Sequence, residues 1–275
     1  MKNNSSALDS QLDALHLPFC KEHCHPSAAK AAKDSLTHLE YFTQLIEGEA
    51  AARSDRAIAR RIKAARFPVI KTLDSFRWDW PQKINRLEVQ NLFNLHFMRD
   101  HGNVIFLGLV GLGKTHLASA LGHAACLQGY SVLFTTAIDV INSLHSAQLK
   151  GALKVEMRRY TAPALLILDE VGYLPIDQRG ADLLFQVISA RYERGSILLT
   201  TNKAFKQWPL LFNGDATIEV TCGGSAAGEG DLFRLAVADL RGLAAARLAG
   251  DEARPWWVFS GPDVTWIMKR GDSME

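Results

Sequence analysis

The sequence has few cysteines and lacks long apolar runs, which are common features of secreted and membrane proteins. Only four cysteines occur in 275 residues, and they are widely scattered, which argues against a disulfide framework. No stretch approaches the ~18 consecutive apolar residues of a membrane-spanning helix. The first twenty residues lack the continuous apolar run of a signal peptide. We therefore expect a cytoplasmic protein with no membrane association.

Charge of one sign is also scarce, since the formal net charge is only +2. Such a balance excludes a strong overall field that would attract an acidic partner, so any affinity for nucleic acid must come from local charge. Hydrophobic residues make up 48% of the chain and charged residues 22%, which is typical of a globular protein. The length is enough for one good core and a smaller second unit, and no internal repeat occurs.

The first third of the chain has a helical pattern. Residues 11–66 are rich in alanine, lysine and arginine at helical spacing, with a single expected break near Pro26. Pro68 is expected to end the last of these helices. Residues 72–82 form an aromatic connector, and residues 83–100 predict a further amphipathic helix.

From residue 103 the pattern changes to short apolar runs that alternate with helical segments. The expected strands are residues 103–109, 131–136, 164–170 and 196–202, and the expected helices are residues 115–127, 138–160 and 181–192. Strands that alternate with helices predict an α/β fold with a parallel sheet covered on both faces.

The segment "GLVGLGKT" follows the first expected strand and precedes the first of these helices. It matches the phosphate-loop pattern G-x-x-x-x-G-K-[ST], in which glycines let backbone N–H groups face phosphates. Lys114 would place a positive charge on the outer phosphates, and the Thr115 hydroxyl would face Mg²⁺. The residues assigned to ATP binding are Gly108, Leu109, Val110, Gly111, Leu112, Gly113, Lys114 and Thr115. The alternative is a glycine-rich turn with a chance lysine. His116 is interpreted as a residue that packs near the loop or supports the residues of the site, and not as a catalyst.

Two acids end the next buried strand, "LLILDE". Asp169 is placed to hold Mg²⁺, together with Thr115, and Glu170 is the candidate base for an attacking water. The alternative is an acidic turn after a core strand. Asn202 ends the strand "SILLTTN" and could orient the water near the γ-phosphate, or could simply be a capping residue. This order of motifs predicts a phosphate-loop ATPase in which an extra strand lies between the loop strand and the acidic strand.

The segment "CKEHCH" places Cys20, His23, Cys24 and His25 close together and suggests zinc. Structural zinc usually joins two separated pairs of ligands, and no second pair follows here. A helix turn with a buried cysteine is the alternative that we favour.

Three long segments resemble the IstB-type transposition helper ATPases. They are "GKTHLASALGHAACLQGYSVLFTTA", "DEVGYLPIDQRGADLLFQVISARYERGSILLTTNKAF" and, before the loop, "RIKAARFPVIKTLDSF". The resemblance covers about residues 10–218. It implies an AAA+ ATPase core with a parallel sheet flanked by helices, preceded by a small helical amino-terminal domain and followed by an atypical carboxy-terminal tail. The corresponding ranges are residues 1–70, which would serve DNA binding and oligomerisation, residues 71–221 and residues 222–275.

The same resemblance implies a function. ATP, with Mg²⁺, would drive self-assembly on duplex DNA; the assembly would then recruit or stimulate a cognate transposase, and hydrolysis would reset it. Two alternatives stay open. One is a loader of the replicative helicase, which has a related fold; the other is a protein that binds ATP and DNA but hydrolyses ATP poorly.

A basic segment at residues 53–71 is the candidate DNA surface. Arg53, Arg56, Arg60 and Lys63 share one helix face, with Ile58 and Ile62 opposite, and such a face suits phosphate backbones without reading base sequence. The alternative is a solvated helix face. The full candidate set is Arg53, Arg56, Arg60, Arg61, Lys63 and Arg66.

The tail departs from the family pattern. The family has an arginine beyond this point that reaches the γ-phosphate of a neighbouring subunit, whereas here "EVTCGGSAAGEG" contains none. Arg234 and Arg241 are the nearest later candidates, and no role is assigned to Arg191 or Arg194. The tail could fold as a helix over residues 231–248, ended by Gly250, followed by a hairpin of "WWVF" and "VTWIMK". Alternatively, it could derive from a shifted or recombined gene end.

Overall fold

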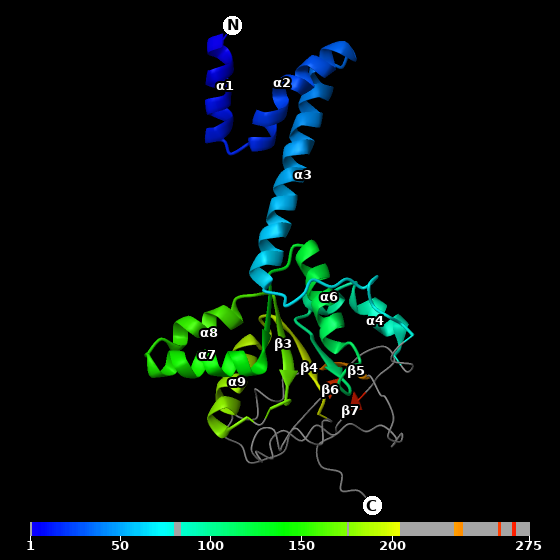
Figure 1. Ribbon diagram of the computed structural model, residues 1–275, viewed down its shortest axis with the longest axis vertical. Coiled ribbons are helices and arrows are strands. Elements are labelled where there is room, and N and C mark those ends of the chain that lie inside the picture. Colours follow the sequence, from blue (N-terminus) through cyan, green and yellow to red (C-terminus); the bar gives the residue numbers. More distant parts are fainter. Residues whose placement is uncertain are drawn as a thin grey trace, which may run out of the picture. The chain divides into compact units, whose positions relative to one another are not determined.

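The computed structural model describes residues 2–79, 84–174 and 176–203, and beyond these the backbone of residues 234–238, 258–259 and 266–267 (Figure 1). The chain divides into two compact units, with the boundary between Arg60 and Arg61. Within the described residues, every helix is too short or too polar to cross a bilayer.

The first unit is helical. Its helices are α1 (Lys2–Ala14), α2 (Pro18–Lys33) and α3 (His38–Ala65), the last of which continues past the unit boundary. The expected break near Pro26 was wrong, because Pro26 lies inside α2. A proline in a helix removes one backbone donor without necessarily ending the helix. The breaks lie instead at His16 and Ser35, whose φ of 55° puts each in the left-handed region.

Close packing of α2 on α3 fixes the first unit. Cys20 and Cys24 are 1% and 6% exposed on α2, which confirms the prediction of a helix with buried cysteines. A Cβ at Gly48 of α3 would lie 2.1 Å from a ring carbon of Phe19. Only glycine therefore lets the Phe19 ring approach the α3 backbone this closely.

The second unit is an α/β layer structure. Its first strands are β1 (Asn103–Leu107), β2 (Val132–Thr136), β3 (Leu165–Val171) and β4 (Ser196–Thr201). Its helices are α4 (Arg86–Leu92), α5 (His96–Arg99), α6 (Lys114–Leu127), α7 (Ala137–Leu149), α8 (Leu153–Thr161) and α9 (Gln178–Arg191). Two expected helices are each divided, because Leu95 has a φ of 56° between α4 and α5, and Gly151 has a φ of 68° between α7 and α8.

The strand order is β2-β3-β4-β1-β5, and β1 to β4 are parallel. The strand β4 therefore lies between the loop strand β1 and the acidic strand β3, as the motif order predicted. Because the strands are parallel, the phosphate loop and Asn202, which follow β1 and β4, lie at the same edge of the sheet as the two acids near the end of β3.

Helices cover both faces of the sheet, with α7, α8 and α9 on one face and α6 on the other (Figure 1). Alternate residues of β3 belong to different hydrophobic clusters: Leu166 and Leu168 pack with α7 and α9, whereas Leu165 and Ile167 pack with α6. Successive side chains of β3 point to opposite faces of the sheet, so both faces of the strand are buried, as its apolar run predicted.

Three strands of the tail are described. The strand β5 (Arg234–Ala238) pairs antiparallel with β1, so the helix expected over residues 231–248 was wrong there. Pairing with the open edge of β1 satisfies backbone groups that a helix would leave exposed. The strands β6 (Val258–Phe259) and β7 (Trp266–Ile267) pair antiparallel, which confirms the hairpin. The expected helix end at Gly250 lies outside the described residues, as does the glycine-rich segment at residues 222–230, whose four glycines predict a linker.

Candidate nucleotide site and basic helix face

The phosphate loop connects the end of β1 to the start of α6. Gly111 and Gly113 have φ values of 84° and 81°, which residues other than glycine rarely adopt. A Cβ at Gly113 would also lie 2.7 Å from a ring carbon of Phe76, in the connector. The Gly108 amide donates to the Thr201 carbonyl at 3.2 Å, which joins the loop to the end of β4.

Lys114 is buried at 4% exposure at the start of α6. Its ammonium donates to the Leu109 carbonyl at 2.8 Å and lies 5.8 Å from the centre of the Tyr173 ring. Burial lowers the pKa of Lys114, and the nearby Asp169 carboxylate opposes this only partly. A cation held this far from water with few partners is well placed to bind an anion.

Asp169 and Thr115 meet across the site. The Thr115 hydroxyl donates to Oδ1 of Asp169 at 3.1 Å, and Asp169 is only 4% exposed. In the part of the chain that the structure describes, neither lysine nor arginine forms an ion pair with this carboxylate. A buried carboxylate beside a hydroxyl is the kind of oxygen-donor set that suits Mg²⁺, so the residues present fit this ion.

Glu170 is exposed, although it follows a buried residue in the same strand. Its φ is 60°, and its amide donates to the Thr200 hydroxyl at 3.0 Å. The same hydroxyl donates to Oδ1 of Asp169. The two acids thus differ in environment: one is buried and hydrogen-bonded, and the other faces solvent, where a water molecule could reach it.

Asn202 directly follows β4 and is only partly buried, but its Oδ1 atom is buried and has no hydrogen-bond partner among the described residues. An unpaired buried amide oxygen costs about 1–3 kcal/mol, so its retention beside the phosphate loop suits a role toward a ligand or water. Its assignment as a water-orienting residue stays a prediction.

Three residues near the site were missed from the sequence: Thr200, Tyr173 and Phe76. The connector packs on α6, because Nε2 of His116 lies 3.2 Å from the Ser75 hydroxyl and its ring meets Phe76 edge to face at 5.3 Å. His116 therefore packs against the connector, which agrees with the first of its two interpretations. The aromatic composition of the connector was the one available signal, because Thr200 and Tyr173 are recognisable only from their contacts.

Arg191, which had no assigned role, is a buried structural residue. It is 1% exposed and donates to the carbonyls of Tyr160, Ala164 and Ser196 at 2.8–3.1 Å. Burial lowers the pKa of Arg191 to about 10. This guanidinium joins the end of α8 to the start of β4 and does not face the phosphate loop.

The residues of the basic face are not equivalent. Arg53, Arg60 and Lys63 are exposed on α3, whereas Arg61 is partly buried and lies near Cys126, whose pKa burial raises to about 11. Arg66 follows the end of α3 with a φ of 60°. The outward charge of the helix itself is therefore carried by the first three residues and by Arg56.

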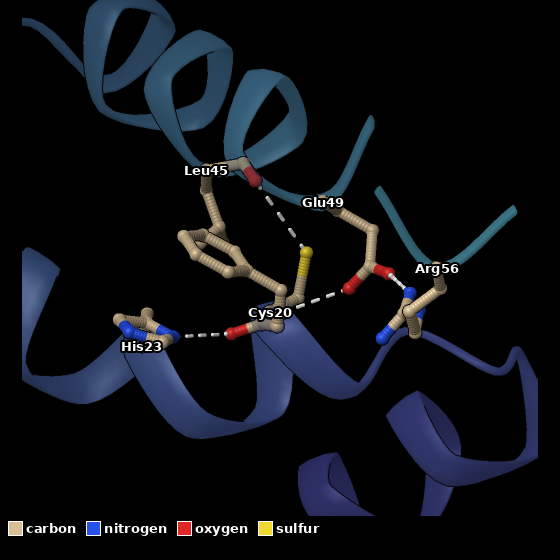
Figure 2. Close-up of polar contacts among 6 residues, drawn as sticks. Cys20, His23, Leu45, Glu49 and Arg56 are labelled. Atoms are coloured by element: carbon tan, nitrogen blue, oxygen red, sulfur yellow. Dashed lines mark hydrogen bonds and ion pairs between the residues drawn. The ribbon is translucent and has the colours of Figure 1, made fainter. Parts of the chain in front are cut away.

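Arg56 already has a partner. Its guanidinium donates to Glu49 at 2.8 Å, and the other Glu49 oxygen accepts the Cys20 amide at 3.1 Å (Figure 2). Burial alone raises the pKa of Glu49, but these hydrogen bonds outweigh it and hold the pKa below its ordinary value. Arg56 thus stabilises the α2–α3 packing, whether or not it also contacts DNA.

The "CKEHCH" residues have local partners within the first unit. The Cys20 thiol donates to the Leu45 carbonyl at 3.7 Å (Figure 2). The His23 ring stacks on Phe19 at 4.0 Å. Within the described residues, no group of three or more histidine, cysteine, aspartate or glutamate side chains is arranged to hold a metal. These contacts give the segment a packing role.

Replacing Arg56 with alanine is expected to destabilise the helical unit by about 1–3 kcal/mol, because the buried Glu49 carboxylate loses its charged donor. Since the folded pKa of Glu49 is lowered, its contribution is present above the ordinary carboxyl pKa and is lost as pH falls through the folded value. Urea unfolding at pH 7 and pH 3 tests this, with Arg60→Ala as control. Equal stability of both variants at pH 7 would show that the pair contributes nothing.

Known proteins with similar sequences are encoded in insertion sequences. A protein described as ATP-binding from insertion sequence IS5376 of Geobacillus stearothermophilus is 38% identical over 194 residues, which cover 70% of this chain and 77% of that one. A protein with the same description from IS21 of Pseudomonas aeruginosa is 37% identical over 205 residues, 74% of this chain and 77% of that one. A solved DnaC helicase loader gives a TM-score of only 0.44 at 20% identity, over 54% of this chain and 89% of that one.

The family model described as IstB-like ATP binding protein matches residues 10–221. This range includes the phosphate loop, both acids and Asn202, and it ends where the glycine-rich segment begins. The chain therefore belongs to the IstB-like ATP-binding protein family, and its α/β core follows a helical amino-terminal region in the sequence.

Proposed function

We propose that this protein is an ATPase that assists DNA transposition. ATP binding would drive its self-assembly on duplex DNA, and the assembly would recruit or stimulate a cognate transposase. The observation that supports this most strongly is the meeting of Lys114, Thr115 and Asp169 at one edge of the sheet, with Glu170 exposed beside them. The insertion-sequence relatives supply the context of transposition.

Within this proposal, each residue of the site has one task. Lys114 and the loop amides would bind the phosphates, and Thr115 and Asp169 would hold Mg²⁺. Bound there, Mg²⁺ would offset the negative charge of the phosphates. Glu170 would accept a proton from the attacking water, which Asn202 would orient.

The exposed face of α3 is the proposed DNA surface. Replacing Arg60 and Lys63 together with alanine should weaken binding to all duplex sequences alike, because contacts to phosphates carry no base information. The slope of log affinity against log salt should fall by about 0.9 for each phosphate that the variant no longer neutralises. Measuring anisotropy of labelled duplexes at several salt concentrations tests this.

Lys30 and Lys33 are exposed on α2 and provide a matched control, since their double replacement removes the same charge from another helix. An unchanged salt slope in the Arg60 and Lys63 variant, or an equal change in the control, would show that the α3 face is not the DNA surface.

The composition of the tail bears on the rate of ATP hydrolysis, which we expect to be slow. In related phosphoryl-transfer enzymes an arginine finger contributes about 10³–10⁵ to the rate, and the segment after residue 218 lacks an arginine until Arg234. The register of β5 places Arg234 opposite Leu107, the residue before the phosphate loop. We therefore propose normal ATP affinity with slow hydrolysis, even when duplex DNA is present.

Steady-state turnover with and without duplex DNA tests this proposal. Replacing Arg234 with alanine should barely lower an already slow rate, and Arg241→Ala is the control. A single substitution is preferable to removal of the tail, because β5 pairs with the loop strand β1. Fast DNA-stimulated turnover that Arg234→Ala alone abolishes would contradict the proposal and identify Arg234 as the finger.

A further inference from the structure

A local irregularity in the sheet sets the positions of the two acids. Between the pairs Leu168–Leu199 and Val171–Thr201, β3 has two residues, Asp169 and Glu170, whereas β4 has only Thr200. Two residues against one is the arrangement of a β-bulge, which bends a strand and changes the direction of its side chains. The bulge is where a buried acid is followed by an exposed one.

The bulge has an energetic cost. Glu170 adopts a φ of 60°, and such a conformation costs a residue with a side chain roughly 1–2 kcal/mol. The Glu170 amide also loses its regular hydrogen bond between strands, in which it would donate to a backbone carbonyl of the neighbouring strand. Some group must accept this hydrogen bond if the amide is to stay satisfied in the sheet.

The side chain of Thr200 accepts the hydrogen bond of the Glu170 amide and also contacts Asp169. The Thr200 hydroxyl accepts the Glu170 amide at 3.0 Å and donates its own proton to Oδ1 of Asp169. Thr200 is 1% exposed, so neither hydrogen bond faces competition from bulk water. The same Asp169 oxygen also accepts from Thr115, the other residue proposed to hold the metal.

We propose that Thr200 is a positioning residue that holds Asp169 and Glu170 in register with each other and with the phosphate loop. It would act through the two acids, which its hydroxyl contacts directly. This inference rests on the proposed ATP hydrolysis, because it assigns to Thr200 the placement of the groups that perform it. Residues that orient metal ligands typically change metal affinity or activity by about 10–100-fold when they are replaced.

Thr200→Val removes the hydroxyl while keeping the branched shape. We expect kcat for ATP hydrolysis to fall at least about 10-fold, and the Mg²⁺ concentration for half-maximal nucleotide binding to rise by a similar factor. At saturating Mg²⁺ the KM for ATP should change little, since Lys114 and the loop are untouched. Thr200→Ser keeps a hydroxyl and should retain most of the unmutated kcat and Mg²⁺ dependence. Thr200→Ala, which differs from Thr200→Ser by one oxygen atom, should show both defects.

The neighbouring Thr201 provides the matched control. It is equally buried, but its hydroxyl donates to the Val171 carbonyl at 2.7 Å and accepts the Lys203 amide at 3.1 Å, so these hydrogen bonds involve neither acid. Thr201→Val should therefore lower the melting temperature, as Thr200→Val does, without shifting the Mg²⁺ dependence. An equal Mg²⁺ shift in both variants would reduce the role of Thr200 to strand stability and overturn the inference.

Nucleotide binding separates this inference from the proposed function, because fluorescent ATP binding as a function of Mg²⁺ requires no turnover. Absence of hydrolysis in the unmutated chain would overturn the proposed ATPase activity alone. The Mg²⁺ titration would then still decide the role of Thr200. A shift in Thr200→Val supports it, and an unchanged titration, or nucleotide binding insensitive to Mg²⁺ in the unmutated chain, overturns it.

Discussion

Replacing Glu170 with glutamine is expected to lower kcat for ATP hydrolysis by about 10²-fold or more, because a positioned general base contributes about 10²–10⁴-fold to such reactions. Glutamine keeps the size of the side chain but cannot accept the proton. Nucleotide affinity should stay close to that of the unmutated chain, since Thr115 and Asp169 still contact each other. Complexes formed on DNA with ATP should last longer, and single-turnover assays with dissociation kinetics measure both effects.

Glu193 gives a matched control for this substitution. It is also exposed and also has a left-handed backbone, with a φ of 54°, but it lies in the turn before β4. Glu193→Gln should leave turnover unchanged. Hydrolysis by Glu170→Gln at the unmutated rate would show that another group activates the water.

Lys114→Ala is expected to have the largest effect on binding. A hydrogen bond to a charged group contributes about 1.5–3 kcal/mol, so losing the ammonium should weaken ATP binding roughly 10–150-fold. Because Lys114 is buried and its pKa is lowered by burial, its removal should cost the nucleotide-free protein little stability. Isothermal titration with ATP, together with thermal melting, separates the two effects.

Lys150 is exposed after α7, and Lys150→Ala controls for the loss of one positive charge. Normal ATP affinity and normal ATP-dependent DNA binding in Lys114→Ala would remove the basis for assigning residues 108–115 to the nucleotide. A large loss of stability in Lys114→Ala would instead make the lysine a structural residue.

The core of the fold could be predicted because its strands are buried on both faces. Short apolar runs located β1, β2, β3 and β4 to within a few residues. The motif order also predicted that β4 lies between β1 and β3. Helix ends were harder, since Leu95 and Ser35 adopt left-handed conformations that their residue types do not favour. The strand β5 depends on the open edge of β1, which no local pattern reveals.

For the candidate site, the residues could be proposed from the sequence, but the contacts between them could not. The spacing of the phosphate loop and the acidic pair predicted that Thr115 and Asp169 face the same ligand, and their 3.1 Å hydrogen bond brings them together. Thr200 was not predicted, because its role arises from a bulge in the pairing of two strands. The partner of Arg56 was equally hidden, since Glu49 becomes buried only when α2 packs on α3.

The central claim is that nucleotide binding controls DNA binding by this chain. The most direct test is the affinity for a labelled random-sequence duplex, measured by anisotropy with ATP and Mg²⁺, with ADP and Mg²⁺, and without nucleotide. We expect tight, salt-sensitive binding with ATP, much weaker binding in the other two conditions, and no effect of ATP on Lys114→Ala. Equal affinity in all three conditions would contradict the account, because the phosphate site would then have no part in DNA binding.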